Sequence, residues 1–209
     1  MRRLDWYFDF VSPFAWLCLS RFRELPADLE ITFRPVLFAG LLEHWGQKGP
    51  AELPTKRLHT YRYCQWWADT HAVPFRFPAT HPFNPLHHLR LAIAAGATRE
   101  SVDTIFRALW TTGADPADPQ RFVELTTRLG VDPARIGSPA IKDALRTGTQ
   151  AAADAGVFGV PTFIVEGELF WGADAVDFLK TWLADPGLFD RAEMRRIATL
   201  PVGAARKGA

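Results

Sequence analysis

The first 36 residues constrain the fold of this chain more than any other segment does. Residues 4–11 are rich in aromatic side chains and predict a strand. Ser12 is a favoured helix N-cap and Pro13 suits the first helical position, so the next residues predict a helix that ends near Leu25. Residues 30–36 predict a second strand. Because two parallel strands need a crossover between them, this spacing predicts a right-handed βαβ unit.

After this unit the sequence changes to helical patterns that are separated by glycine and proline, over residues 37–156. Another Ser-Pro pair, Ser138-Pro139, marks the start of the last of them. The predicted helices are 54–70, 85–95, 99–111, 119–129 and 139–155.

Strand patterns return near the C-terminal end. Residues 161–165 and 168–171 predict two strands, and Glu166-Gly167 between them is a two-residue hairpin turn. Asp174 is placed to cap a helix over residues 175–183, which has an apolar face. This half of the pattern is therefore ββα.

The order βαβ, helical block, ββα predicts an α/β protein with a thioredoxin-like fold and a large all-helical insertion between its halves. We assign residues 1–36 and 157–186 to the thioredoxin-like domain and residues 37–156 to the helical insertion. Residues 187–209 form a C-terminal extension, with a short helical piece near 191–198 and an end that we expect to be frayed.

Composition and charge exclude several classes of function. The 209 residues carry a formal net charge of +1 and no basic stripe with interleaved aromatics, so nucleic acid is not an expected partner. No segment approaches the roughly 20 apolar residues that cross a membrane, and the first residues lack the apolar core of a signal peptide. We therefore expect a cytoplasmic protein. His81, His87 and His88 lack the spacing of a metal motif, so no metal is predicted.

The turn at residues 12–15 is the main candidate for a functional site. A strand that runs directly into a helix presents the free N–H groups of the helix to the turn, and these suit a thiolate. Thiol-disulfide enzymes with this layout carry Cys-Pro-x-Cys there, whereas this chain has Ser12-Pro13-Phe14-Ala15. The two cysteines, Cys18 and Cys64, have no redox spacing and are expected to be buried. The turn is therefore suited to a thiol of another molecule.

Three segments carry a resemblance to a known family. Residues 7–17 read YFDFVSPFAWL, residues 157–163 read VFGVPTF, and residues 169–174 read LFWGAD. Together they resemble the signatures of the 2-hydroxychromene-2-carboxylate isomerases, which are close relatives of the kappa-class glutathione transferases. The resemblance extends from about residue 4 to residue 183 and implies a DsbA-type thioredoxin fold.

The resemblance also implies glutathione as the cofactor. Ser12 matches the catalytic serine that lies beside the glutathione sulfur. Val160 matches the residue before the family's cis-proline, here Pro161, and its backbone would pair with the glutathione peptide. Gly172, Ala173 and Asp174 match the segment in which the acid holds the γ-glutamyl ammonium.

The substrate implied by the resemblance is a small aromatic carboxylate, and the implied assembly is a homodimer. Gln47, Lys56 and Asn84 fall where family members have polar residues that face the substrate. The chain departs from the family at Gln47, where asparagine is frequent, and at Ala173 and Ala175, where a polar and a basic residue are usual. These departures leave fewer polar groups for the glutamyl part of glutathione.

The chemistry expected of Ser12 is hydrogen bonding to a thiolate. Lowering a thiol pKa by about two units from about 8.5 takes about 2.7 kcal/mol. A helix N-terminus supplies roughly 1–2 kcal/mol and a hydroxyl that donates to an anion about 1.5–3 kcal/mol. No neighbouring base is evident, so Ser12 would be a donor and not a nucleophile.

The leading prediction is a glutathione-dependent cis-trans isomerase of an aromatic-degradation intermediate, of the type that converts 2-hydroxychromene-2-carboxylate to trans-o-hydroxybenzylidenepyruvate by reversible thiolate addition. A kappa-like transferase that conjugates small electrophiles is the first alternative, and a non-catalytic peptide or partner binder is the second.

Ordinary structural roles also stay open: Ser12 and Asp174 as helix caps, Lys56 as a solvated charge, and the tryptophans, including Trp66 and Trp67, mostly as core.

Overall fold

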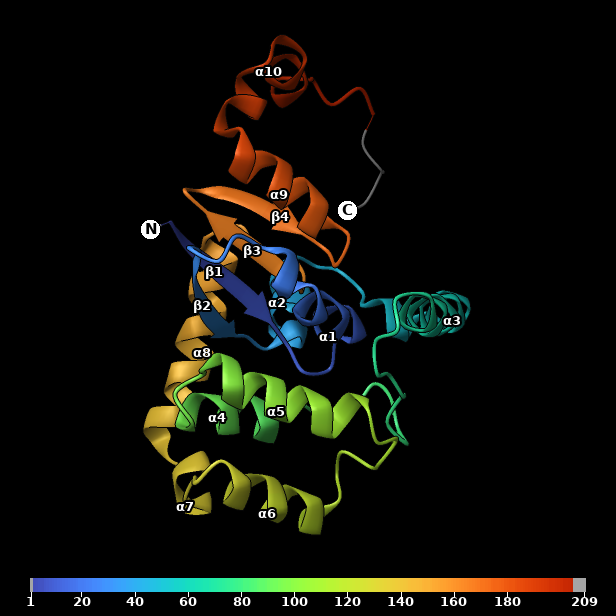
Figure 1. Ribbon diagram of the computed structural model, residues 1–209, viewed down its shortest axis with the longest axis vertical. Helices are drawn as coiled ribbons and strands as arrows, with labels where there is room; N and C mark the ends of the chain where they lie inside the picture. The colour runs from blue at the N-terminus through green and yellow to red at the C-terminus, as the bar shows by residue number, and fades with distance from the viewer. Residues whose placement is uncertain (1, 205–209) are drawn as a thin grey trace.

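A four-stranded sheet joins the two ends of the chain (Figure 1). The computed structural model of the protein describes residues 2–204, so the expected fraying of the last five residues lies outside the described part. The sheet order is β2-β1-β3-β4, with β1 parallel to β2 and the other pairs antiparallel, which confirms the predicted fold class. The strands are β1 (Arg3–Phe8), β2 (Glu30–Pro35), β3 (Thr162–Val165) and β4 (Glu168–Trp171).

The strand patterns explain this sheet. On β1 every second side chain is buried, as expected for a strand with one face on the core. Trp6 of β1 stacks on Phe8 with 4.6 Å between ring centroids and meets Phe33 of β2 edge-on. Glu166 and Gly167 both have positive φ (50° and 89°), which the favoured two-residue hairpin turns require.

Helices make up the part of the sequence between β2 and β3. Figure 1 shows α4 to α7 gathered at one end of the molecule and α3 projecting to one side. All five predicted helices of this block are present, each within a residue of the expected bounds. The block comprises α2 (Phe38–His44), the 3-10 turn η2 (Pro50–Glu52), α3 (Pro54–Thr70), α4 (Leu86–Ala94), α5 (Arg99–Trp110), α6 (Pro119–Arg128), α7 (Pro133–Ile136) and α8 (Pro139–Asp154).

The remaining helices lie between β1 and β2 or after β4. The first helix ends at Ser20 and not near Leu25, because the chain tightens into a 3-10 turn after Arg21. These elements are α1 (Pro13–Ser20), η1 (Phe22–Glu24), α9 (Ala175–Ala184), η3 (Pro186–Asp190) and α10 (Ala192–Ala198). None of the helices in residues 2–204 has the length and hydropathy of a membrane span.

The sequence did not predict α2 and α7. The start of α2 is held by distant groups: the Phe38 N–H donates to the Asp9 carboxylate at 2.8 Å, and the Leu37 N–H donates to the Thr149 hydroxyl at 2.9 Å. Because both acceptors are remote in sequence, no local cap marks this helix. α7 is a single turn of four residues, too short for a periodic pattern.

Tryptophan burial differs in part from the expectation. Trp6, Trp16, Trp110 and Trp182 belong to the core, but Trp66 on α3 is 57% exposed. Trp45 and Trp171 are also exposed. Trp66 is therefore an exception to the expectation of a mostly buried set, since α3 projects from the body and leaves one of its faces uncovered (Figure 1).

Candidate functional site

The Ser12 turn forms as predicted at the start of α1. Ser12 has extended backbone geometry, and its hydroxyl oxygen accepts a hydrogen bond from the Ala15 N–H at 3.2 Å. The same hydroxyl donates to the Val160 carbonyl at 3.5 Å, a long and weak bond. The fold thus brings together two predicted site residues that lie 148 positions apart.

The first helical N–H groups of α1 are only partly used. Pro13 has no N–H, and the Ala15 N–H is bonded to Ser12. Within residues 2–204, no hydrogen bond is made by the Phe14 N–H. One N–H and one weakly bonded hydroxyl are therefore available at the turn, which is the donor set that a thiolate needs.

Asp9 connects this turn to α2 through hydrogen bonds. Its carboxylate is fully buried and accepts the Val11 N–H at 3.0 Å and the Phe38 N–H at 2.8 Å, so it links the turn to α2. Burial raises the pKa of Asp9 to about 7, although its hydrogen bonds to backbone N–H groups oppose the shift. A charged residue within an apolar strand pattern is the sequence signal for this role.

His81 connects the turn to α3 through hydrogen bonds. His81 Nε2 lies 2.8 Å from the Val11 carbonyl, and Nδ1 lies 2.6 Å from the Tyr61 hydroxyl on α3. Burial lowers the pKa of His81. The histidine is thus a link between the turn and α3, and no local pattern could have indicated it.

A cavity of about 350 Å³ lies beside the turn, between α1, α3 and the β3–β4 half of the sheet. Five of the predicted residues meet there, because Val160, Pro161 and the segment 172–174 all line it. The Val160–Pro161 peptide bond is cis. Its remaining lining residues are mainly aromatic or apolar: Phe14, Leu17, His59, Thr60, Tyr63, Trp67 and Trp171.

One face of α3 forms the far wall of this cavity, and the sequence analysis missed it. His59, Tyr63 and Trp67 follow each other at intervals of four residues, so they lie on the same side of the helix, and Thr60 joins them. This spacing was visible in the sequence. It could not be interpreted, since a helix face of this kind is more often part of the core.

Asp174 has a different local role from the predicted one. It occupies the N-cap position of α9, but its backbone is helical and its side chain makes no capping bond, so the predicted cap is wrong. Gly172 has φ of 106°, and a side chain there would collide with the Asp174 carboxylate. Within residues 2–204, no hydrogen bond or ion pair satisfies this exposed carboxylate. It is therefore free to hold a cationic group.

The three predicted substrate residues lie outside the cavity lining. Gln47 is exposed after α2, and Lys56 is exposed in the first turn of α3. Asn84 accepts the Leu86 N–H at 3.0 Å at the start of α4. Their assignment to the substrate stays a prediction.

The cysteines contribute no redox pair. Cys18 and Cys64 are unpaired and fully buried, as expected. Burial raises the pKa of Cys64 to about 12 and that of Cys18 further. No cluster of three potential metal ligands is found within residues 2–204.

Comparison with known proteins agrees with this fold. Residues 3–184 match the model of the DSBA-like thioredoxin domain. The chain is 30% identical over 186 residues to a 2-hydroxychromene-2-carboxylate isomerase of Pseudomonas sp. (strain C18), covering 85% of this chain and 88% of that protein. It is 23% identical to human glutathione S-transferase kappa 1, over 88% of this chain and 92% of that protein.

Among solved structures, one described as a 2-hydroxychromene-2-carboxylate isomerase superposes with a TM-score of 0.75 at 26% identity. The match covers 96% of this chain and 100% of that one. The relatives that share this length and fold are thus enzymes by name, isomerases first and a transferase at greater distance. The chain belongs to the DSBA-like thioredoxin family and, within it, to the family of 2-hydroxychromene-2-carboxylate isomerases.

Proposed function

We propose that this chain is a glutathione-dependent isomerase of a small aromatic carboxylate. The observation that carries the proposal is that Val160 and the unpaired Asp174 line one cavity, which the Ser12 turn reaches through Phe14, while the Ser12 hydroxyl lies against the Val160 carbonyl. The Ser12 turn, the Val160 backbone and the Asp174 carboxylate would hold the sulfur, the peptide and the ammonium of glutathione, respectively. When bound, glutathione would supply a thiolate that adds reversibly to a conjugated carbon and allows the former double bond to rotate.

The role of Ser12 is to stabilise negative charge at the sulfur position. Its hydroxyl now donates to the Val160 carbonyl over 3.5 Å, so donating to an anion instead would break only a weak hydrogen bond. The unbonded Phe14 N–H and the N-terminus of α1 add to the same field. Together these terms match the roughly 2.7 kcal/mol that a two-unit shift of the thiol pKa requires.

The aromatic lining supports a flat substrate. Phe14 and Tyr63 lie with 6.1 Å between ring centroids, and Trp171 is 53% exposed on the opposite side. Rings of this kind bind a planar aromatic group by stacking and edge contacts. Lys56, Gln47 and Asn84 remain the proposed partners of the substrate's polar groups.

We propose that two copies associate. Large apolar side chains stay exposed at the end of α2 and on α3 and its N-cap, which supports a homodimer as the working assembly; they include Trp45, Leu53, Leu58 and Trp66. Within each copy, residues 1–36 and 157–186 act as the thioredoxin-like domain and residues 37–156 as the insertion that supplies the far wall of the cavity. Sedimentation analysis of the purified protein tests the assembly.

A glutathione titration followed by melting temperature tests the cofactor. At a concentration 100 times the Kd, binding adds about 2.7 kcal/mol to the free energy of unfolding. The wild type should be stabilised, and Asp174→Ala should lose most of the effect. Product analysis then separates the activities, since an isomerase returns glutathione unconsumed and a kappa-like transferase leaves it as a thioether. No stabilisation of the wild type would favour the non-catalytic binder.

A further inference from the structure

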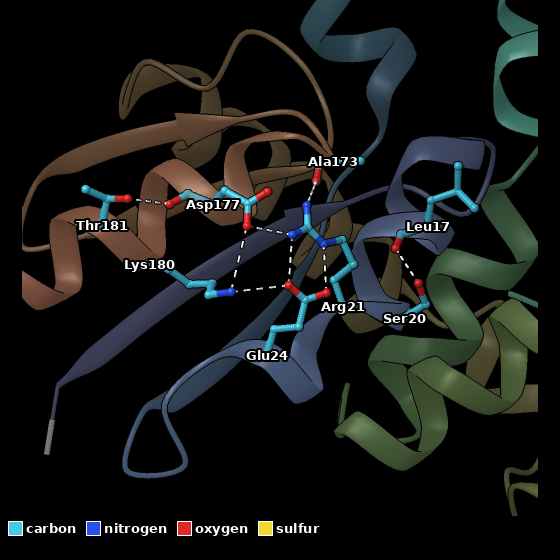
Figure 2. A network of polar contacts seen from close by, with 8 residues as sticks. All are labelled: Leu17, Ser20, Arg21, Glu24, Ala173, Asp177, Lys180 and Thr181. Carbon is cyan, nitrogen blue, oxygen red and sulfur yellow. Dashed lines mark hydrogen bonds and ion pairs between the residues drawn. The ribbon is translucent and has the colours of Figure 1, made fainter. Parts of the chain in front are cut away.

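A cluster of four charges joins the end of α1 to the first turns of α9 (Figure 2). Arg21 donates from Nε and Nη2 to the two carboxylate oxygens of Glu24 at 2.9 and 2.8 Å, and from Nη2 to Asp177 at 2.8 Å. The Lys180 ammonium lies 3.4 Å from Glu24 and 3.7 Å from Asp177. Two cations thus balance two anions, and Arg21 is the centre of the cluster.

Arg21 also reaches the segment before α9. Its Nη1 donates to the Ala173 carbonyl at 3.4 Å, while Nη2 bonds Asp177. These two contacts lie on either side of Asp174, the acid that lacks a protein partner. The Arg21 side chain is only 13% exposed and its contact with the Ala173 carbonyl is partly buried, whereas the Asp177 side chain is 69% exposed and that bond faces water. Arg21 thus contacts the segment that carries Asp174 on both sides of that residue.

The position of Arg21 on α1 gives this contact its importance. The helix begins after Ser12 as N-cap and ends with Arg21 as C-cap. One short helix thus carries Ser12, the group for the sulfur, at one end and Arg21, which contacts the Asp174 segment, at the other. Because a helix rises about 1.5 Å per residue, the length of α1 and the contacts of Arg21 together set the distance between the Ser12 hydroxyl and the Asp174 segment.

We propose that Arg21 is a positioning residue for recognition of the γ-glutamyl group, acting through the Ala173 carbonyl and Asp177 on Asp174. The inference rests on the proposed binding of glutathione. The planar guanidinium directs several N–H groups in one fork, which a lysine ammonium cannot reproduce. The two cations of the cluster pair with its own two anions, so the Asp174 carboxylate stays available to the ligand's ammonium.

The test compares two thiols in four proteins. Dissociation constants for glutathione and for cysteinylglycine, which lacks the γ-glutamyl group, are measured by calorimetry for the wild type, Arg21→Lys, Glu24→Gln and Arg196→Lys. Arg196 forms a similar two-bond pair with Glu193 on α10 and is the matched control.

We expect Arg21→Lys to lower the preference for glutathione over cysteinylglycine about tenfold, which corresponds to about 1.4 kcal/mol. Glu24→Gln, which removes the charge that orients Arg21, should lower it in the same direction, and Arg196→Lys should leave it unchanged. An equal loss for both thiols, or an unchanged preference, would overturn the role of Arg21 while glutathione binding stands. A wild type that binds neither thiol would instead refute the proposed function itself.

Discussion

Replacing Ser12 by alanine tests the proposed chemistry most directly. The variant removes the hydroxyl that now bonds the Ala15 N–H at 3.2 Å and the Val160 carbonyl at 3.5 Å. A hydrogen bond to a charged group contributes about 1.5–3 kcal/mol. Since one pKa unit corresponds to about 1.36 kcal/mol, the pKa of bound glutathione should rise by about 1–2 units in Ser12→Ala.

Ultraviolet absorbance of the thiolate, recorded against pH at saturating glutathione, measures this pKa. The variant also loses a helix cap, which costs about 1 kcal/mol of stability. Ser138→Ala is the matched control, because Ser138 also precedes a proline and its hydroxyl accepts the Ile141 N–H at 3.4 Å at the start of α8. It should lower the melting temperature similarly and leave the thiol pKa unchanged. An unchanged pKa of the bound thiol in Ser12→Ala would refute the assignment.

Three further predictions concern residues around the site. Burial raises the pKa of Asp9 to about 7, whereas the carboxyl of the unfolded chain has a pKa of about 3.9. At pH values between these two pKa values the folded state therefore holds a proton that the unfolded state has lost. The free energy of unfolding should fall as pH rises through that window, and urea unfolding of Asp9→Asn should lack this slope. Gly172→Ala should displace the Asp174 side chain and so weaken glutathione binding, measured by calorimetry, at least about tenfold, or about 1.4 kcal/mol. Gly156→Ala is the control, because Gly156 also has a positive φ but lies in open space, and it should leave the affinity unchanged. Burial raises the pKa of Cys64 to about 12 and shields both thiols, so a maleimide should label neither cysteine in the native protein and both in denaturant; native labelling would contradict their burial.

Local patterns were sufficient for much of the architecture. Ser-Pro at residues 12–13 and 138–139 predicted two helix starts, and both serines cap their helices. The hairpin at Glu166-Gly167 followed from turn chemistry that two adjacent residues contain. Each of these features depends on contacts within a few positions of the chain, so a single sequence carries the full signal.

The failures have physical causes. Helix α2 begins where the Asp9 carboxylate and the Thr149 hydroxyl accept its first N–H groups, and those acceptors come from distant segments. Local propensity decides only between local alternatives, and tertiary contacts override it at this point. Asp174 does not cap α9 because its backbone is helical where a capping residue needs extended geometry.

The sequence by itself determined the order of the strands and of the longer helices, the fold class and the identity of the turn that has Ser12 and Ala15 in place of two cysteines. Only the tertiary structure placed Ser12 against Val160, set Asp174 free of a protein partner and added a wall from α3 to the cavity. The reason is that backbone periodicity and turn chemistry are short-range. A binding site is a convergence of side chains from distant segments, and its geometry exists only once those segments have packed.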